Sequence, residues 1–381
     1  MYRYLIFQNI IAPYKTLLFN SLVRVLGRTF LVVYLAETAG NREWKVARDE
    51  IAFPYEVLAP GREEDATSLK MAAAAYRSLE RHNPEVVVVG GYNYPAYWAA
   101  LLWAKRRKRR AIIIIESHYL DRPRRRAQEA IKRIFVSRFD AALVDGTRHR
   151  EYAMSLGLPQ EKIFIKNGTG PVDLEFYQSN VARFRPDKER HCRDIGLPPR
   201  NFLFVGRFSA EKNILLLLRA YRKFREGGTA RWGLILLGNG PQRDEIKRFI
   251  RDHSLEEVVL PGFKQKEEIP FYYSVSEVLV LPSLSEPWGL VVDEAMASGL
   301  AVLVSNRCGC YPDLLRDGVN GYSFDPGDCE DLAFRMREIA SGDADVDAMG
   351  RASLEIISNY TPEIVSQVYA RVLRLVGRDG P

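Results

Sequence analysis

Two glutamates, Glu286 and Glu294, lie eight residues apart in the stretch SEPWGLVVDEAMASG. A residue that precedes proline is disfavoured in the α region, so Glu286 is expected to be extended and to lie outside the helix that follows. That helix is expected to begin around residues 288–290 and to end at Gly299, a residue type common after the last helical turn. One carboxylate therefore stands before the helix and the other stands within it.

The start of this helix is a candidate phosphate site, because its first amides have no acceptor inside the helix; they belong to Gly289, Leu290 and Val291. Helical side chains lean toward the N-terminus, so Glu294 can reach over that end. A carboxylate in contact with a phosphate would repel it. Both glutamates are better suited to accept hydrogen bonds from neighbouring hydroxyls, such as those of a ribose and a sugar ring. The alternative is that Glu294 only complements the helix dipole and Glu286 is a surface residue.

A second candidate lies in FVGRFSAEKN, where a buried strand is predicted to end at Gly206. Arg207 and Lys212 follow in the strand-to-helix turn. An arginine fork and a lysine point charge together can neutralise a diphosphate. The alternative is a pair of solvated cations.

Other motifs give less. The Gly-Asn-Gly turn at 238–240 is not G-x-G-x-x-G and is weak evidence for a nucleotide. His118 ends the strand IIIIESH and would stand at the mouth of a cleft, although a lone histidine is usually structural or at the surface. Asp343-Ala-Asp345 lies in a Ser/Gly/Asp-rich turn and is discounted as a metal motif, and Cys308-x-Cys310 lacks the second pair of a zinc site. No metal site is expected.

The elements that must position these residues form two series of short apolar runs rich in β-branched residues. They lie at 2–8, 29–36, 85–91, 111–117, 139–146 and 162–168, and at 201–207, 232–238, 257–262, 277–283, 300–305 and 321–325. Continuous apolar runs that alternate with helical patterns are typical of parallel sheets covered on both faces. The sequence therefore predicts an α/β protein with two doubly wound domains whose strand ends face a cleft.

The predicted domains span 1–180 and 198–360, with a charged linker at 178–200. Thr361 and Pro362 mark the start of a C-terminal helix, within 361–381, that could pack on either domain and is assigned provisionally to the first.

Composition sets the compartment and the partners. The 381 residues are 47% hydrophobic, contain four cysteines and have no apolar run long enough for a membrane span or signal peptide, so we expect a cytoplasmic protein. Of the net charge of +7, residues 1–177 carry 28 Lys+Arg against 19 Asp+Glu. The excess centres on KRRKRR (105–110) and RPRRR (122–126). It favours either a peripheral, purely electrostatic contact with an anionic membrane surface or a helix cap followed by a solvated loop. No nucleic-acid-reading module accompanies the charge.

Taken in order, the motifs resemble the retaining GT-B glycosyltransferases of family 4. The resemblance rests on VGR-x₄-K (205–212), LLGNGP (236–241), Glu286-x₇-Glu294, SNRCGCYPDLL (305–315) and DGVNGYSF (317–324), which cover the second half of the chain. The first half matches through IESH, the VDG turn (144–146) and LGLPQEKIFIKNG (156–168). The resemblance implies a GT-B fold and a hexosyltransferase-type enzyme that uses a nucleotide-diphosphate sugar as co-substrate, with no cofactor and no metal, in the biosynthesis of a polysaccharide, glycolipid or natural-product glycoside.

The resemblance also implies roles. Arg207 and Lys212 would hold the diphosphate, Glu294 the ribose, and Glu286 and His118 would face the transferred sugar. The first strand-to-helix loop, Asn9–Lys15, departs from the family because it lacks the usual glycine pair. The sequence identifies neither the sugar nor the acceptor, which could be lipid-linked, a small glycan or an aglycone. Alternative functions are a non-catalytic, membrane-associated partner of the same fold, or a sugar-nucleotide epimerase.

Overall fold

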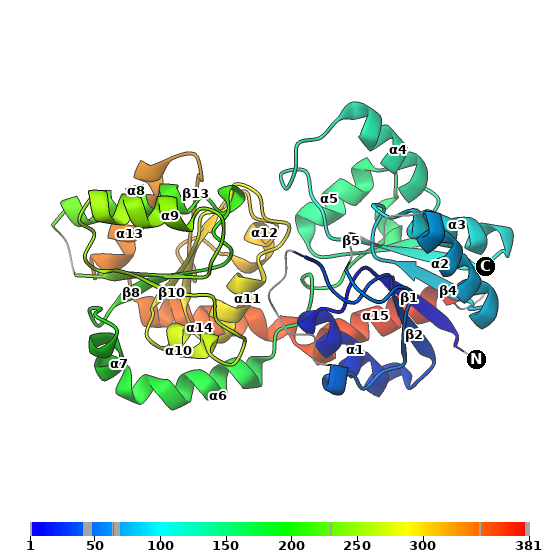
Figure 1. Ribbon diagram of the computed structural model, residues 1–381, viewed down its shortest axis with the longest axis horizontal. Helices are drawn as coiled ribbons and strands as arrows, with labels where there is room; N and C mark the ends of the chain where they lie inside the picture. The colour runs from blue at the N-terminus through cyan, green and yellow to red at the C-terminus, as the bar shows by residue number, and fades with distance from the viewer. Residues whose placement is uncertain are drawn as a thin grey trace. The chain divides into compact units, whose positions relative to one another are not determined.

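The computed structural model describes residues 2–40, 48–62, 64, 69–228, 231–342 and 344–377. The chain divides into two compact units (Figure 1). The first unit comprises Met1–Tyr119, Pro123–Pro171 and Tyr360–Pro381, and the second comprises Leu120–Arg122 and Val172–Asn359. Each unit is built on one parallel sheet, which confirms the predicted α/β class with two doubly wound domains.

The first sheet has the strand order β3-β2-β1-β4-β5-β6-β7, and all its pairs are parallel. Its strands are β1 (Tyr4–Gln8), β2 (Phe30–Tyr34), β3 (Tyr55–Val57), β4 (Val86–Val89), β5 (Arg110–Ile115), β6 (Ala141–Val144) and β7 (Ile163–Ile165). The sequence missed β3, because its three residues are exposed or only half-buried and form no apolar run.

Helices cover both faces of this sheet. They are α1 (Pro13–Leu26), α2 (Leu69–His82), α3 (Pro95–Arg106), α4 (Arg126–Val136), α5 (Thr147–Ser155) and α15 (Pro362–Gly377). Side chains of α2, α3, α4 and α5 form the core on one face, and those of α1 and α15 form the core on the other. The C-terminal helix thus packs on the first unit, beside α1. It begins at the predicted Pro362, and Thr361 Oγ1 accepts a hydrogen bond from the amide of Ile364 at 3.4 Å.

The second sheet has the order β10-β9-β8-β11-β12-β13 and is also parallel. Its strands are β8 (Asn201–Val205), β9 (Gly233–Leu237), β10 (Val258–Gly262), β11 (Val278–Leu281), β12 (Ala301–Ser305) and β13 (Gly321–Phe324). Its helices are α6 (Leu174–Phe184), α7 (Lys188–Asp194), α8 (Ile214–Glu226), α9 (Arg243–Asp252), α10 (Ile269–Ser274), α11 (Leu290–Ala297), α12 (Tyr311–Leu314), α13 (Cys329–Ala340) and α14 (Val346–Ile357). Helices α8, α9 and α13 pack on one side of the sheet, and α10, α11 and α14 lie on the other.

The segment 178–200, expected as a linker, is instead largely helical and belongs to the second unit. Asp173 caps α6 by accepting a hydrogen bond from the amide of Phe176 at 3.0 Å, and Tyr177, Val181 and Cys192 are buried. Single apolar residues spaced along a charged segment thus anchor two short helices, and the high charge of their exposed faces hides this pattern in the sequence.

Candidate functional site

The predicted site residues of the second unit follow two neighbouring strands. Strands β8 and β11 pair in parallel, so their carboxyl ends lie at the same edge of the sheet. Strand β8 leads through Gly206 and Arg207 into a 3₁₀ turn, η5 (Ala210–Lys212), and β11 leads into the loop that carries Glu286. This topology brings together two segments that are 74 residues apart in the sequence.

Lys212 and Glu286 form an ion pair at this edge. Their side chains are 19% and 12% exposed, so the pair is largely withdrawn from solvent. Ser283 lies 3.4 Å from the same Glu286 carboxylate oxygen and donates a hydrogen bond to it. An ion pair of low exposure is only weakly screened, so each partner fixes the position of the other.

The predicted glycines lie against this pair. A Cβ atom placed on Gly206 would lie 4.0 Å from Cε of Lys212. A Cβ atom on Gly289 would lie 3.5 Å from Cγ of Glu286 and 3.0 Å from Leu281. Gly289 has φ 113°, a conformation that a residue with a side chain rarely adopts, and it is the residue from which α11 starts. The helix start is therefore held beside Glu286 by a position that needs glycine.

Helix α11 begins at Leu290, as the sequence predicted. Because their partners would precede the first turn, the amides of Gly289, Leu290 and Val291 have no acceptor inside the helix. Leu290 and Val291 are only half-buried. The end of the helix next to Glu286 therefore keeps the electropositive character that suits a phosphate.

Arg207 is the most accessible of the predicted cations. Its side chain is 47% exposed, and its guanidinium pairs with Glu211 Oε1 at 2.8 Å. The backbone of Glu211 in turn accepts a hydrogen bond from the amide of Leu284, at 2.8 Å, which fastens η5 to the loop before Glu286. Arg207 can exchange an exposed carboxylate partner for another anion at little cost, because exposed ion pairs contribute little.

The Gly-Asn-Gly turn has a structural reason. A Cβ atom on Gly238 would lie 1.9 Å from the carbonyl oxygen of Gly206, and one on Gly240 would lie 2.5 Å from that of Phe208. The Phe208 amide donates to Asn239 O at 2.8 Å, and the Phe208 carbonyl accepts from the Gln242 amide at 3.0 Å. These glycines let the turn after β9 interlock with the turn that carries Arg207.

Glu294 lies in α11 among tyrosines. The Tyr273 hydroxyl donates a hydrogen bond to Glu294 Oε2 at 2.9 Å, and Tyr177 hydrogen-bonds to the same carboxylate. Burial raises the pKa of Glu294 above its usual range, although the two hydroxyls and the positive charge of Lys266 oppose this shift. The carboxylate is thus held by two donors, a role that Glu294's spacing from Glu286 does not reveal.

Sequence reasoning missed Asp293, the neighbour of Glu294. It is buried, and both of its carboxylate oxygens accept from Trp288 Nε1, at 3.1 and 3.0 Å. The amides of Gly309 and Cys310 donate to the carbonyls of Glu286 and Trp288 at 3.0 and 3.2 Å. The two cysteines of that loop, Cys308 and Cys310, are buried and not joined in a disulfide, and burial raises the pKa of Cys310. The loop therefore supports the backbone of Glu286.

In the first unit the structure places His118 differently from the expectation. Its side chain has no exposed surface, and its ring packs edge-on against His149, with 5.3 Å between the ring centroids. His149 Nε2 lies 3.9 Å from Asp145 Oδ2. His118 is therefore part of the packing at the strand ends and is not at an open surface.

Four charged side chains lie buried or half-buried at the carboxyl edge of the first sheet; we call Lys15, Glu116, Asp145 and Lys166 the charge cluster. Lys15 pairs with Glu116 and donates to Thr169 O at 3.1 Å. Lys166 Nζ lies 2.6 Å from Asp145 Oδ1 and 3.8 Å from Glu116. Lys15, Asp145 and Lys166 are almost inaccessible, and Glu116 is 33% exposed. The Asn9–Lys15 loop thus sends a lysine into the unit.

The charge cluster shifts the pKa values of its members. Burial opposes the charged form of Lys15, but Glu116 and other groups overcome this and raise its pKa. Burial lowers the pKa of Lys166. For Asp145, burial acts upward, but Lys166, His149 and Lys15 together hold its pKa below the usual range. A signal was available in the sequence, because Glu116 and Asp145 each directly follow a buried strand and Lys166 directly follows the half-buried strand β7.

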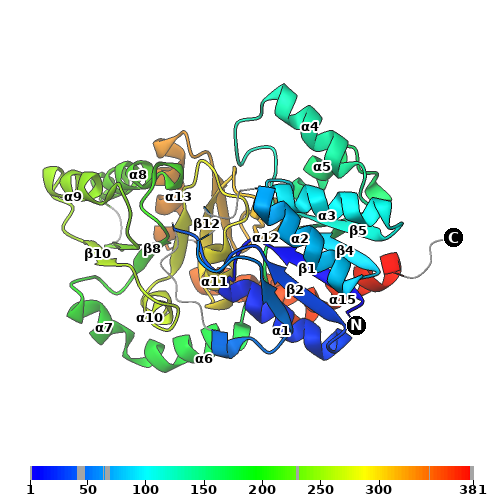
Figure 2. The same ribbon diagram turned by 45° about the vertical axis from the view of Figure 1, so that its right-hand side comes forward.

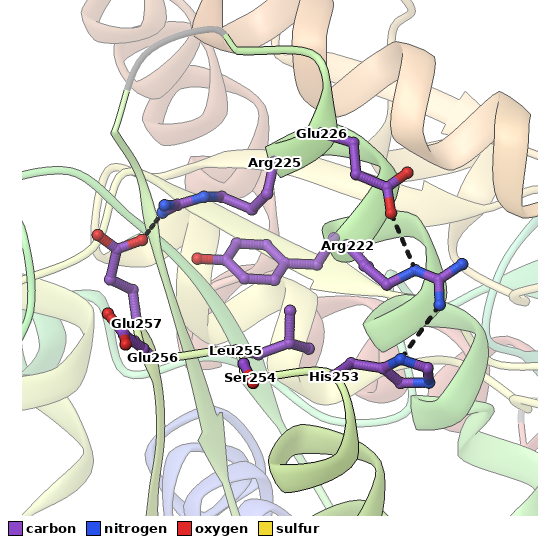
Figure 3. Close-up of a pocket in the computed structure, with 9 residues that line it drawn as sticks. Arg222, Arg225, Glu226, His253, Ser254, Leu255, Glu256 and Glu257 are labelled. Atoms are coloured by element: carbon purple, nitrogen blue, oxygen red, sulfur yellow. Dashed lines mark hydrogen bonds and ion pairs between the residues drawn. The ribbon is translucent and has the colours of Figure 1, made fainter.

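A pocket of about 460 Å³ lies elsewhere in the second unit (Figure 3). It is formed by the end of α8 and the residues that lead into β10, and so lies at the amino edge of the sheet. Its charges neutralise one another: Arg225 pairs with Glu257, and Arg222 lies 3.3 Å from Glu226 and 3.2 Å from His253. It contains none of the predicted site residues.

Two features are absent from the part of the chain that the structure describes. No group of three or more His, Cys, Asp or Glu side chains there is arranged to hold a metal ion. Asp343 lies outside the described residues. No helix found there combines the length and apolar character needed to cross a lipid bilayer.

Comparison with known families and relatives accounts for most of the chain. Residues 187–366 match the family described as glycosyl transferases group 1, and residues 20–168 match the glycosyl transferase 4-like domain. The sulfoquinovosyl transferase SQD2 of Arabidopsis thaliana is 32% identical over 193 residues, which are 50% of this chain and 36% of that protein. The amylovoran biosynthesis glycosyltransferase AmsK of Erwinia amylovora is 30% identical over 243 residues, 61% of this chain and 53% of that protein. The chain thus spans about half or less of these relatives.

Solved structures share the fold at low identity. Alr3699/HepE of Anabaena, in complex with UDP and glucose, superposes with a TM-score of 0.74 at 18% identity and covers 98% of this chain and 100% of its own. A glycosyltransferase from Rickettsia africae gives a TM-score of 0.78 at 14% identity, with 100% of both chains covered. These similarities show the two-domain fold, which is the GT-B fold expected from the sequence.

Proposed function

We propose that the chain is a group 1 glycosyl transferase and that it transfers a sugar from a nucleotide-diphosphate sugar to an acceptor hydroxyl. The match of residues 187–366 to that family and of residues 20–168 to the glycosyl transferase 4-like domain supports this proposal. We propose further that it is a hexosyltransferase of family 4 that retains the configuration of the sugar and needs no metal. The observation that carries the proposal is the Lys212–Glu286 pair beside the start of α11. It puts a cation, a carboxylate and free helical amides at one sheet edge.

The donor is proposed to occupy this edge. Arg207 and Lys212 would pair with the diphosphate, and the amides at the start of α11 would assist them. Glu294 would accept hydrogen bonds from the ribose. Structures with the same fold have been solved with UDP and glucose and with UDP-glucose, which supports a nucleoside diphosphate sugar as the donor class.

Lys212 connects the donor-free state to the proposed donor complex. Without a diphosphate it neutralises Glu286. A bound diphosphate would attract the same ammonium group, and Glu286 would then turn its carboxylate to a hydroxyl of the transferred sugar. The ion pair therefore keeps both groups charged and in place before the donor arrives.

In the transfer step, the bond between the sugar's anomeric carbon and the diphosphate oxygen breaks, and a bond from that carbon to the acceptor oxygen forms on the same face. The acceptor proton passes to the departing phosphate oxygen, so the products are a glycoside and a nucleoside diphosphate. Stabilising the charge on the leaving diphosphate is the main contribution that Arg207 and Lys212 would make to the rate. His118 would face the sugar only after its buried ring becomes accessible.

The acceptor is proposed to be a precursor of a polysaccharide or glycolipid. Relatives named for amylovoran and sulfoquinovosyl transfer support this class. The whole chain should be incubated with a panel of nucleotide sugars, with and without EDTA, and slow donor hydrolysis followed by mass spectrometry. We expect hydrolysis of one donor class that survives EDTA. Tight nucleotide binding without any turnover would favour the non-catalytic partner instead, and strict dependence on added Mg²⁺ or Mn²⁺ would refute metal independence.

A further inference from the structure

Apolar side chains stand exposed on two neighbouring helices of the first unit. Ile131 and Ile134 of α4 are each 55% exposed, and Leu102 and Trp98 of α3 are 48% and 38% exposed. The Trp98 ring stacks on that of Phe135 in α4, with 4.1 Å between centroids, so the two helices are in direct contact. We call these four residues the α3–α4 face. Helix α4 stands at the margin of the first unit in Figures 1 and 2.

Helix α4 is amphipathic in an unusual sense. It buries only Phe135 and Val136, and it turns its one acidic residue inward. Glu129 accepts hydrogen bonds from Lys132 Nζ and the Tyr152 hydroxyl, both at 2.7 Å, and lies 3.7 Å from Arg124. These donors outweigh the effect of burial and lower the pKa of Glu129. The outward side of α4 therefore carries isoleucines and arginines but no carboxylate.

The cations around the α3–α4 face are available to a partner. Residues 95–138 contain 13 Lys+Arg and only 3 Asp+Glu. Arg125, Arg126 and Arg133 are exposed, and no carboxylate of the described residues lies within ion-pair distance of them. An exposed apolar strip bordered by unpaired arginines matches the chemistry of an anionic lipid surface, which offers phosphates outside and hydrocarbon beneath.

The KRRKRR run is less available than its sequence implies. Arg107 pairs with Glu80 at 2.6 Å, and Lys105 and Arg110 lie 3.2 and 3.4 Å from Asp140. Arg109 donates to the side chain of Asn83 at 3.2 Å. Half of this run is thus paired with carboxylates of the same unit. The arginines of α4 therefore contribute more of the unpaired positive charge than the sequence suggests.

We propose that the α3–α4 face docks on an anionic lipid bilayer, with Ile131 and Ile134 inserted at the level of the headgroups and the arginines of α4 paired with lipid phosphates. Insertion replaces the purely electrostatic contact that the sequence predicts. The proposal rests on the first unit alone and does not depend on glycosyl transfer.

Co-sedimentation of the full chain tests the docking. Vesicles of equal parts phosphatidylglycerol and phosphatidylcholine should bind the protein, and pure phosphatidylcholine vesicles should not. Ile131→Ser/Ile134→Ser should weaken binding roughly tenfold or more, because two isoleucines no longer leave water. The matched control is Val319→Ser/Phe334→Ser, which alters two exposed apolar residues of the second unit and should leave binding unchanged.

A charge variant tests the second half of the proposal. Arg125→Gln/Arg126→Gln/Arg133→Gln should abolish sedimentation, whereas Lys247→Gln/Arg248→Gln/Arg251→Gln on α9 should not. Circular dichroism of each variant would verify its fold. Wild-type binding should also decline as salt rises, since the arginines are exposed and screened.

Trp98 reports insertion directly. Among the tryptophans that the structure describes, Trp103, Trp232 and Trp288 are buried and Trp98 is exposed. Anionic vesicles should shift the emission to shorter wavelength, lipids brominated near the headgroup should quench it, and Trp98→Phe should remove both effects. Absence of binding at low salt overturns the proposal. Binding that survives the isoleucine substitutions overturns the insertion. Equal binding to both kinds of vesicle overturns the requirement for anionic lipid.

Discussion

The two sheets present charged residues at the same place, the carboxyl edge, but treat them differently. In the first unit Lys15, Asp145 and Lys166 are almost inaccessible; Lys15 pairs with Glu116, and Lys166 pairs with Asp145. In the second, Arg207 is 47% exposed and the Lys212–Glu286 pair retains some access to solvent. Equivalent topology therefore does not give equivalent access to solvent. Buried charged side chains hold the edge of a sheet together, and partly exposed ones can exchange their partner for a ligand.

The difference also explains why only one edge is proposed as the donor site. In the second unit the turns leave helical amides and an exposed arginine beside the ion pair. In the first unit Lys15, in the first turn of α1, enters the charge cluster. Six substitutions, taken from the largest expected effect to the smallest, would break or sharpen this contrast.

The largest effect is expected from Lys166→Met. It leaves Asp145 buried without its closest cation, which typically costs about 3–5 kcal/mol. Urea denaturation followed by circular dichroism would measure the loss. Lys166→Met combined with Asp145→Asn should recover much of the stability, because neither charge then remains unpaired. Equal losses for the single and double variants would mean that the pair does not hold this edge together.

The same pair has a pH signature. The pKa of Asp145 is lower in the folded chain than in the unfolded one, so its contribution to stability is present above the unfolded value of about 3.9 and is lost as pH falls below it. Asp145→Asn should therefore flatten the acid limb of the stability profile. An unchanged acid limb would show that protonation of Asp145 does not cause the loss of stability at low pH.

Glu286→Gln should have the next largest effect, and on rate alone. If Glu286 contacts the transferred sugar and not the phosphates, transfer should fall on the order of 10²–10³-fold while UDP affinity stays near the wild-type value. Calorimetry with UDP and a turnover assay measure the two quantities. Glu211→Gln removes a neighbouring carboxylate and serves as the control with little change. A parallel loss of UDP affinity in Glu286→Gln would contradict the assignment.

Arg207→Ala and Lys212→Ala should each weaken UDP binding by about 1.5–3 kcal/mol, the range for a hydrogen bond to a charged group, and weaken uridine binding far less. Lys212→Ala should show the larger effect on rate as well, because it also leaves Glu286 without its cation. Calorimetry with both ligands distinguishes phosphate contacts from contacts to the nucleoside. Equal losses for UDP and uridine would place these cations away from the diphosphate.

Tyr273→Phe should have the smallest effect. The lost hydroxyl donates to Glu294 and lowers its pKa, so the already raised pKa should rise further. If the Glu294 carboxylate accepts from the ribose, UDP binding should weaken as pH falls through this pKa, and the variant should shift that limb upward by less than about one unit. UDP titrations across acidic pH would reveal the shift. An unshifted limb would separate Glu294 from nucleotide binding.

The fold was predictable from the sequence because its strands are apolar on both faces and remain visible without a partner. The exception, β3, has half-exposed residues and takes its form from pairing with β2. The start of α11 was equally visible, since Pro287 and Gly289 act through their own backbone. Backbone preferences of this kind depend on a few adjacent residues and can be recognised from the sequence alone.

Partners distant in sequence were not predictable. Lys212 pairs with Glu286, and Tyr273 and Tyr177 hold Glu294, only because strand order brings those segments together. The charge cluster illustrates the same limit: the position of three of its members after strands was visible in the sequence, but their pairing with one another was not. The helical character of 178–200 was missed because a few buried side chains decide it against many exposed charges.

The placement of α15 has a consequence for how the chain is made. Val365, Tyr369, Val372 and Leu373 complete the core behind α1, and Ser366 hydrogen-bonds to Ser21 at 3.1 Å. A ribosome therefore delivers the last piece of the first unit only after the whole second unit has been synthesised. The later unit, continuous apart from three residues, can assemble during translation, whereas the earlier one keeps a sheet face that only α1 covers until α15 has been synthesised. In this chain the order of synthesis and the order of completion are reversed.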